Sequence, residues 1–278
     1  MAAEVLVLGA NGFIGLHVVD ALRAEGIEPR CGRRNRSQVL GLRSRKANMV
    51  HADLDDAASL VGAMRGCHTV VHVAGHYPRT STDRQATLKL GVDQSRTLLH
   101  ALRRSGVSRL VYVSSTATVA PRARGASTEV DTFPSPPGIG VYHDLKWAME
   151  RVFAQAGDIE VRVALPSGNI GPGDLRLGTS ALVVALARGD DPPHPDGIVS
   201  LVDPRDAAVG IARLAVRDET PARVILSAAS VRLHPLMAVL ARRYGVATPR
   251  APLSASAARE LAARRGEHGL STRTRAAR

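Results

Sequence analysis

The chain has 278 residues, of which 45% are hydrophobic and only 3% aromatic, and its formal net charge is +12. This length and apolar content suffice for one large domain, or for one domain with a smaller lobe. No apolar run in the sequence reaches the ~18–20 residues that a membrane span requires, and the N-terminus lacks the basic start and long apolar core of a signal peptide. We therefore expect a cytoplasmic protein with no membrane partner.

The positive charge is concentrated near the C-terminus. From residue 242 onward there are nine arginines and only two acidic residues, so this end supplies +7 of the net charge. The rest of the sequence is nearly balanced, and aromatic residues that could stack on bases are scarce, which argues against a nucleic-acid partner. Residues 256–278 are rich in alanine and arginine, and we expect a basic, mobile tail. The two cysteines, Cys31 and Cys67, show no disulfide or metal-ligand spacing, so we expect no metal.

Strand-like and helix-like segments alternate from the N-terminus onward. Apolar residues 5–8 predict a buried strand, and the helical spacing that follows ends at Gly26. Further strands are predicted near residues 31–34, 47–54, 68–75, 108–115 and 160–165, and further helices at 57–66, 86–106 and 141–156. This alternation predicts an α/β fold: a Rossmann-type doubly wound parallel sheet with helices on both faces.

The pattern loosens after residue 171, which suggests a second unit. We assign residues 1–171 to a first domain, which carries this sheet and to which residues 199–221 return as a strand and a helix. Residues 172–198 and 222–255 then form a small C-terminal substrate lobe. We place this lobe over the carboxyl edge of the sheet, where ligands of open α/β sheets bind.

The segment GANGFIG lies between the first strand and the first helix, which is the context that a dinucleotide-binding turn requires. Gly9 permits the tight turn, Gly12 lets the backbone approach a pyrophosphate, and Gly15 lets the helix pack close to the strand. The helix N-terminus would then face the negative phosphates. The other residues of the candidate cofactor site in this turn are Asn11, Phe13 and Ile14.

The residues after the second predicted strand bear on the choice of dinucleotide. An acidic residue about 20 positions after the glycines would bind the ribose of NAD. Here the sequence reads CGRRNRSQ, without an acid, and Arg33, Arg34 and Arg36 could bind the 2′-phosphate of NADP. Arginine is also common throughout this chain, which leaves chance as the alternative. We expect NADP(H) in preference to NAD(H).

The segment VYHDLKWAME holds Tyr142 and Lys146 four residues apart, on one face of a predicted helix. The chain has only three lysines. One explanation for Lys146 is that it is an ordinary cation on a surface helix. The other is an acid–base pair, in which the lysine charge lowers the tyrosine pKa toward the working pH.

Over residues 4–230 the sequence resembles the extended short-chain dehydrogenase/reductase family, of the NAD-dependent epimerase/dehydratase type, and in particular its dihydroflavonol-reductase-like members. Six segments in a fixed order carry the resemblance: GANGFIG, ADL at 52–54, VVHVAG at 70–75, VYVSSTATV at 111–119, Tyr142-x-x-x-Lys146 and PSGNIGPGD at 166–174. The resemblance implies the Rossmann fold, NAD(P) as cofactor and a small-molecule substrate. It also implies a homodimer that pairs the helices near residues 84–104 and 144–156.

The resemblance also implies roles for single residues. The catalytic set would be Thr116, Tyr142 and Lys146. Other cofactor contacts would come from two residues near the adenine, three along the cofactor trough, one hydroxyl before Thr116 and three residues beside the nicotinamide. In that order these are Asp53, Leu54, Val73, Ala74, Gly75, Ser114, Pro166, Ser167 and Gly168. The position of His76 and Tyr77 after the fourth predicted strand makes them candidates for substrate contact, with solvated loop residues as the alternative.

The sequence departs from the family pattern in three places. The family asparagine of an N-V-x-G-T stretch is absent, because residues 91–95 read GVDQS. Nucleotide-sugar members of the family carry an arginine for the substrate pyrophosphate just before a V-H-V-D-D-like stretch. The corresponding residues 199–203 read VSLVD, without that arginine, and this argues against a nucleotide-sugar substrate. The C-terminus is short, so we expect a reduced lobe.

Three functions remain open at this point. The first is an NADPH-dependent oxidoreductase, either a ketone or aldehyde reductase or an alcohol dehydrogenase, with a Thr-Tyr-Lys site. The second is an epimerase or dehydratase with bound, recycling NAD(P), acting on a sugar or another hydroxylated substrate. The third is a cofactor-binding regulator without turnover.

Overall fold

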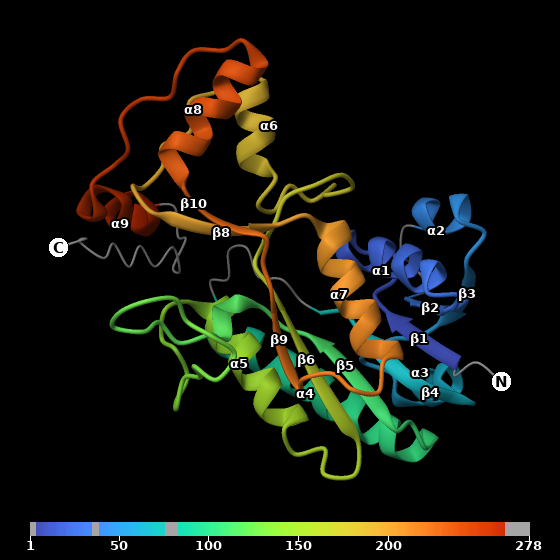
Figure 1. Cartoon of the computed structure of the whole chain (residues 1–278). Coiled ribbons are helices and arrows are strands. Elements are labelled where there is room, and N and C mark those ends of the chain that lie inside the picture. The colour runs from blue at the N-terminus through green and yellow to red at the C-terminus, as the bar shows by residue number, and fades with distance from the viewer. Residues whose placement is uncertain (1–3, 35–38, 76–82, 265–278) are drawn as a thin grey trace.

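A computed structural model describes residues 4–34, 39–75 and 83–264 of the chain. Its main body has three layers, with a seven-stranded parallel sheet between two layers of helices, and a smaller lobe stands at one edge of that sheet (Figure 1). The predicted doubly wound α/β fold is confirmed.

The central sheet contains every strand predicted before residue 170. Its spatial order is β3-β2-β1-β4-β5-β6-β9, and all neighbouring pairs are parallel. Strands β1 to β3 are added in one direction across the sheet, and β4 and the strands after it are added in the other direction, starting beside β1. A crevice for ligands is expected at the carboxyl ends of β1 and β4, where this order reverses. The strand bounds are β1 Glu4–Leu8, β2 Arg30–Arg33, β3 Asn48–His51, β4 Cys67–His72, β5 Arg109–Val113, β6 Glu160–Pro166 and β9 Arg223–Leu226.

The helices bury apolar faces against both sides of the sheet. On one side lie α3 (Ala57–Met64), α4 (Arg84–Ser105) and α5 (Val141–Phe153). On the other side lie α1 (Phe13–Ala24) and α7 (Pro204–Val216). Helix α2, Leu40–Ser44, adds one buried leucine to that second core. The two cores together exclude water from nearly all of β1, β4 and β5, and so hold the carboxyl ends of these strands in fixed positions.

Helices α4 and α5 approach each other closely where the family asparagine is missing. Gly91 of α4 is buried, and a side chain there would overlap Leu145 of α5 and lie 3.5 Å from the sulfur of Met149. An apolar contact therefore occupies the place of the expected polar group. This contact fixes how α5, which carries Tyr142 and Lys146, lies against the sheet.

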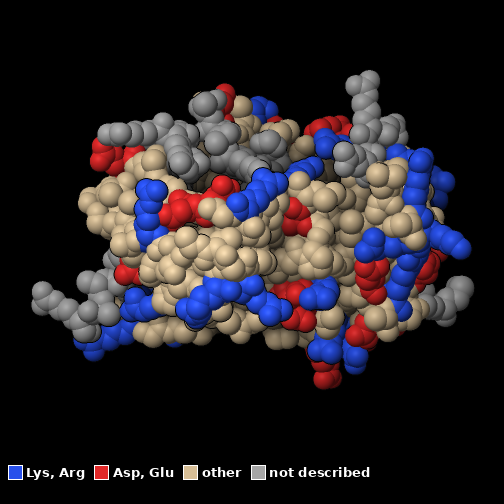
Figure 2. Space-filling model, turned by 90° about the horizontal axis from the view of Figure 1, so that it is seen from above, with Lys and Arg blue, Asp and Glu red and all other residues tan. Residues whose placement is uncertain are grey.

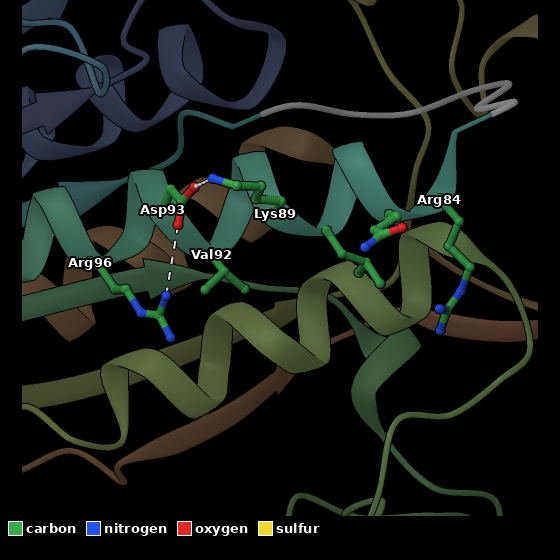
Figure 3. A pocket seen from close by; sticks show the side chains of 7 residues that line it. Arg84, Lys89, Val92, Asp93 and Arg96 are labelled. Carbon is green, nitrogen blue, oxygen red and sulfur yellow. Dashed lines mark hydrogen bonds and ion pairs between the residues drawn. The ribbon is translucent and has the colours of Figure 1, made fainter.

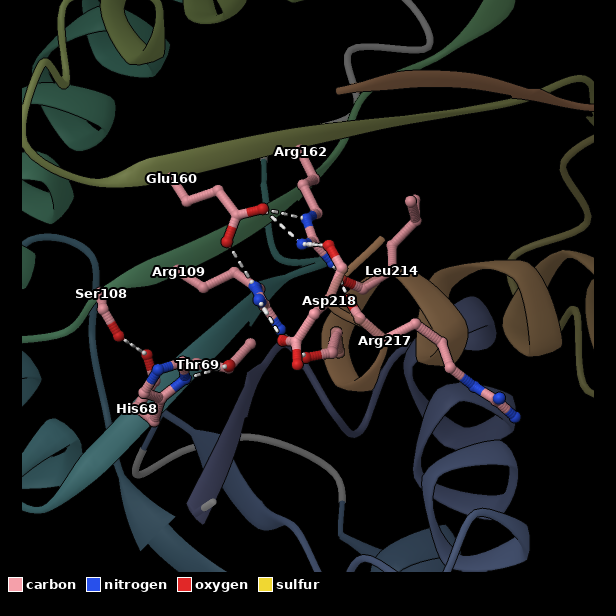
Figure 4. A network of polar contacts seen from close by, with 10 residues as sticks. His68, Thr69, Ser108, Arg109, Glu160, Arg162, Leu214, Arg217 and Asp218 are labelled. Atoms are coloured by element: carbon pink, nitrogen blue, oxygen red, sulfur yellow. Dashed lines mark hydrogen bonds and ion pairs between the residues drawn. The ribbon is translucent and has the colours of Figure 1, made fainter. Parts of the chain in front are cut away.

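Two buried arginines fasten α7 to the amino edge of the sheet (Figure 4). Arg162 of β6 donates to the carbonyl oxygens of Leu214 at 2.8 Å and Asp218 at 2.7 Å, and also to that of Arg217. Arg109 of β5 donates to the carbonyl oxygen of Ala215 at 3.1 Å. The Glu160 carboxylate forms ion pairs with both arginines, and the Asp218 carboxylate forms one with Arg109. The arginines therefore satisfy carbonyls at the C-terminus of α7 that have no partner inside the helix.

The lobe is built on a second, three-stranded sheet in the order β10-β8-β7. Its strands are β7 Gly168–Asn169, β8 Ile198–Val202 and β10 Ala229–Arg232, and its helices are α6 Ala181–Ala187, α8 Leu233–Tyr244 and α9 Ala255–Arg264. His194 and His234 stack with their ring centroids 5.2 Å apart, and Nε2 of His194 lies 2.9 Å from Nδ1 of His234. The pair connects the segment after α6 to the first turn of α8.

Strand pairing differs from the expected domain division in two places. Strand β8, whose residues we expected to return to the first domain, pairs with β7 and β10 in the lobe. Strand β9, which we assigned to the lobe, pairs with β6 in the main sheet. Both strands are only four or five residues long, so the sequence carries little information about their partners. The expected tail begins with helix α9, and residues 265–278 lie outside the described residues.

Charged side chains are spread over the lobe face of the molecule. Figure 2 shows Lys and Arg in several separate groups on this face, interspersed with Asp and Glu and with broad uncharged areas. Some lobe arginines are paired, as Arg250 is with Asp191 at 2.9 Å and Arg232 with Asp196 at 3.8 Å. Among the helices of the described ranges, none is both long enough and apolar enough to cross a membrane.

Candidate active site

The glycine turn lies at the carboxyl end of β1, directly beside the end of β4. The Gly12 amide donates a hydrogen bond to the Gly9 carbonyl at 2.9 Å, which closes the turn. Gly9 has a φ of +81°, and a Cβ there would lie 2.7 Å from the backbone of Ala74. A Cβ on Gly15 would overlap the Gly9 carbonyl oxygen. Glycine is therefore required at Gly9 by both conformation and space, and at Gly15 by space.

The first turn of α1 is suited to hold phosphate groups. Gly12 is its N-cap and offers no side-chain acceptor, so the amides of the first turn are not capped by that residue. Apart from its two chain neighbours, the one described atom within 4 Å of a Cβ on Gly12 would be the Gly9 carbonyl oxygen, at 3.1 Å, so the described residues leave room for a ligand to approach the backbone. The positive end of the helix dipole adds to the attraction for an anion. The residues of this turn thus fit the pyrophosphate of NAD(P).

The other candidate cofactor residues follow neighbouring strands at the same edge. Arg33 ends β2, and Arg34 comes directly after it. Residues 53–54 follow β3, where the Asp53 carboxylate accepts from the Asp55 amide at 3.2 Å. Residues 73–75 follow β4, and the Val73 amide donates to the Leu8 carbonyl of β1 at 3.0 Å. Arg36, His76 and Tyr77 lie outside the described residues.

Residues 166–168 connect the main sheet to the lobe. Pro166 ends β6, and the Ser167 amide donates to the Leu226 carbonyl of β9 at 3.0 Å. Gly168 opens β7 and pairs with Leu201 of β8. The Ser167 hydroxyl is buried and has no hydrogen-bond partner within the part of the chain that the structure describes. Such an orphaned group fits a ligand atom bound at this position.

Lys146 points from α5 to the carboxyl end of β5. Its Nζ donates to the Val113 carbonyl at 3.0 Å and lies 3.5 Å from the hydroxyl of Tyr112, whose ring it overlies at 5.1 Å. Desolvation lowers the pKa of Lys146 to about 8, while the negative charge of Glu150 acts in the opposite direction. Tyr142 stands one turn earlier on the same helix, with its ring 6.1 Å from that of His143.

A buried histidine lies beneath this lysine. His72, at the end of β4, is 1% exposed and stacks on Tyr112 with ring centroids 5.5 Å apart. Burial, together with the nearby charge of Lys146, lowers the pKa of His72 to about 3. The same burial raises the pKa of Tyr112 well above its ordinary value. Both rings therefore stay neutral beneath the charged lysine at neutral pH.

Thr116 opens a short 3-10 helix, η1 (Thr116–Thr118), which is separated from β5 by two serines. The Ser115 hydroxyl caps this turn by accepting from the Ala117 amide at 3.1 Å. Helix α5 lies against η1, so the segments that carry Thr116, Tyr142 and Lys146 are neighbours. The Ser114 hydroxyl is buried and donates to Glu150, so its hydrogen is directed to α5.

Sequence reasoning did not single out Glu150, Arg223, Tyr112 or His72. Glu150 continues the four-residue spacing of Tyr142 and Lys146, and this spacing was the one signal that could have identified it. The other three residues are brought to the site by sheet pairing. Among the described residues, no group of three or more His, Cys, Asp or Glu side chains is arranged to bind a metal.

An open groove runs along the outer face of α4, beside α5 (Figure 3). Two apolar side chains lie within a border of charged ones. Lys89 pairs with Asp93 at 2.5 Å, and Arg96 approaches the other carboxylate oxygen of Asp93 at 3.7 Å. The lining residues are Arg84, Gln85, Leu88, Lys89, Val92, Asp93 and Arg96.

Comparison with known proteins relates the chain to enzymes that use a nicotinamide cofactor. Residues 5–191 match the model of the NAD dependent epimerase/dehydratase family. A Synechocystis sp. protein provisionally named dihydroflavonol 4-reductase is 30% identical over 90% of this chain and 75% of its own length. Cinnamoyl-CoA reductase 1 of Oryza sativa is 29% identical over 73% of this chain and 65% of its own. A solved nucleoside-diphosphate-sugar epimerase from Pseudomonas aeruginosa has the same fold, with a TM-score of 0.83 at 24% identity over 95% of this chain and 84% of its own.

The burial of His72 predicts a loss of stability in acid. The unfolded chain binds a proton at this histidine near pH 6.5, whereas the folded chain does so only near pH 3. Stability present above pH 6.5 is therefore lost as the pH falls, by about 1.4 kcal/mol per pH unit for one proton. We expect His72→Leu to flatten the dependence of the unfolding free energy on pH between 7 and 5, measured by urea titration. The exposed His100→Leu is the matched control, and an unchanged slope in His72→Leu would contradict the argument.

Proposed function

We propose that this chain, which belongs to the NAD dependent epimerase/dehydratase family, is an oxidoreductase. It would reduce a ketone or aldehyde with NADPH, or oxidise the corresponding alcohol in the reverse direction. Because it belongs to this family, the chain is an NAD(P)-dependent enzyme. The observation that carries the proposal is Lys146, a desolvated cation held at the carboxyl end of β5 and one helical turn from Tyr142. The curated relatives that are named reductases favour this reaction over others of the family.

The proposed mechanism assigns one task to each side chain. When bound, the reduced nicotinamide supplies a hydride to the carbonyl carbon. Tyr142 donates a proton to the carbonyl oxygen, and Thr116 donates a hydrogen bond to the same oxygen. Lys146 stabilises the tyrosinate that remains, and it would also help to hold the ribose of a bound cofactor. Its compact ammonium group suits these two tasks better than the wide guanidinium fork of an arginine.

The cofactor would lie along the carboxyl edge of the sheet. The glycine turn and the first amides of α1 would bind the pyrophosphate, with Asp53 and Leu54 near the adenine. Residues 73–75 would line the trough, and Pro166, Ser167 and Gly168 would border the nicotinamide. Arg33 and Arg34 would bind the 2′-phosphate that distinguishes NADP from NAD.

An epimerase or dehydratase with recycling NAD(P) is the second candidate, and the solved epimerase with the same fold favours it. A nucleotide-sugar substrate is less well supported. The family arginine is missing from this part of the sequence, and the nearby Arg205 is already engaged by both carboxylate oxygens of Asp203, at 2.9 and 2.6 Å. A non-catalytic role is disfavoured by the intact Thr116, Tyr142 and Lys146.

We further propose that a second copy of this chain covers the groove on α4. The groove has an apolar centre, Leu88 and Val92, and a border that carries both signs of charge, so two copies related by a twofold axis could pair there. Helix α5 lies alongside and would extend the contact.

Substitution of the groove centre should separate such a dimer. We expect Val92→Glu to lower the mass measured by light scattering from that of two chains to that of one, because it buries a charge in the interface. Leu40→Glu, at a position 78% exposed on α2, is the control and should keep the parent mass. A parent protein that is monomeric at micromolar concentration would overturn the dimer.

Replacement of the tyrosine hydroxyl tests the reaction itself. Tyr142→Phe keeps the ring, so folding and NADPH binding should survive, while turnover of a panel of small ketones and aldehydes should fall by ~10²–10⁴-fold. Tyr244→Phe, at an exposed position of α8, is the matched control. Turnover by Tyr142→Phe at the parent rate would exclude the proton-donor role.

Cofactor preference is tested at the end of β2. We expect the double variant Arg33→Ala/Arg34→Ala to bind NADPH about 10–100-fold more weakly and NADH with unchanged affinity, since one or two charge-assisted hydrogen bonds are lost. Calorimetric titration of both nucleotides gives the comparison. The exposed Arg65→Ala, which precedes the amino end of β4, controls for the loss of positive charge. A parent protein that prefers NADH would contradict the assignment.

A further inference from the structure

Glu150 stands on the same face of α5 as Tyr142 and Lys146, one turn beyond the lysine. Its Oε1 accepts hydrogen bonds from the Ser114 and Thr118 hydroxyls, the latter at 2.6 Å. Its Oε2 pairs with Nη2 of Arg223 at 3.4 Å. One carboxylate thus connects α5 with the end of β5, with η1 and with the start of β9.

The two hydroxyls that Glu150 binds flank Thr116 in the sequence. Ser114 precedes the 3-10 turn and Thr118 closes it, and both are almost fully buried, at 3% and 1% exposure. Holding both ends of a turn this short fixes the residue between them. The Glu150 carboxylate therefore sets where Thr116 lies relative to the helix that carries Tyr142 and Lys146.

Arg223 balances the charge of this carboxylate and extends its contacts. Its Nη2 donates to the Thr118 hydroxyl at 2.9 Å, and its Nη1 donates to the Glu129 carbonyl at 2.6 Å. The Glu129 carboxylate in turn accepts from the Ile225 amide of β9 at 3.0 Å. A largely buried carboxylate is costly unless it is paired and hydrogen-bonded, and here both conditions are met.

The charge of Glu150 also acts on Lys146. The groups around the lysine are Tyr142 and Glu150 on its own helix, Tyr112 on β5 and His72 on β4. Both Tyr112 and His72 are held neutral by burial, so Glu150 is the anion among these groups that opposes the desolvation of the lysine. Without it, the pKa of Lys146 would fall below its present value of about 8.

We propose that Glu150 is a positioning residue of the active site, which holds the Thr116 turn against α5 and keeps Lys146 in its charged form. The proposal rests on the proposed roles of Thr116, Tyr142 and Lys146. Neither a hydrophobic residue nor a glutamine at position 150 could fill both tasks, since the first lacks acceptors and the second lacks the charge.

Glu150→Gln tests the electrostatic part with little change in shape. A neutral residue 150 lowers the pKa of Lys146, so the fall of kcat/KM on the alkaline side should move to lower pH by about one unit. At pH 8 we expect a loss of about 5-fold, because the charged fraction of Lys146 falls from about one half to about one tenth. Activity should recover toward that of the parent at pH 6, where Lys146 is protonated again. A role in folding alone would lower the rate by the same factor at every pH.

The control and the second variant keep the outcome unambiguous. Glu219→Gln, at an exposed position before β9, removes one negative charge away from the lysine and should keep the parent profile. If Glu150→Gln fails to fold, Thr118→Val removes one donor to the carboxylate, together with the hydroxyl that accepts from Arg223, and leaves the charge of Glu150 in place. It should then lower kcat several-fold with unchanged affinity for NADPH, because Thr116 is displaced while the cofactor contacts stay.

The result can be separated from a failure of the proposed function. An active Tyr142→Phe would overturn the reaction mechanism whatever Glu150 does. An inactive Tyr142→Phe, together with a Glu150→Gln variant that keeps the parent pH profile and rate, would overturn the role of Glu150 alone. A parent kcat in Thr118→Val would likewise overturn the positioning of Thr116.

Discussion

The closeness of β1, α1 and β4 at the glycine turn is the constraint on which the site depends. A single added carbon at Gly9 would press on Ala74 at 2.7 Å, and one at Gly15 would overlap the Gly9 carbonyl. No side chain can therefore separate these three segments. Their closeness sets the reversal point of the sheet beside the first turn of α1, which has no side-chain cap from Gly12, and this is the arrangement that the proposed phosphate site requires.

Electrostatics at the same edge depend on which groups are allowed to be charged. Burial keeps His72 and Tyr112 neutral, and Lys146 remains a cation with a carbonyl, an aromatic face and the Glu150 carboxylate near it. A lysine whose pKa is near 8 is still mostly charged at neutral pH but responds to small changes in its surroundings. The pH range in which the site works would thus be set by His72, Tyr112 and Glu150, which act on the pKa of Lys146 and need not touch the substrate.

The fold was largely predictable because its signals are local. Runs such as residues 5–8 and the turn at Gly9 and Gly12 report strand, turn and helix within one short window. The partners of β8 and β9 could not be predicted, because pairing of such short strands is decided by segments far along the chain. The same limit applies to Glu150 and Arg223, which are 73 residues apart in sequence. The contact of Gly91 with Leu145 shows why the missing asparagine does not leave a hole: an apolar side chain fills the space.

The buried arginines at the opposite edge of the sheet divide the molecule chemically. Arg109 and Arg162 hold the end of α7 through guanidinium groups, which do not lose their proton in proteins. Lysine could not replace Arg162, because the compact ammonium cannot reach three carbonyl oxygens that the guanidinium fork contacts from two nitrogens. The amino edge is therefore fastened in a way that is indifferent to alkali, while the carboxyl edge carries the titrating lysine. A change of solution pH would be felt first where the ligand enters, and the anchorage of α7 would persist beneath it.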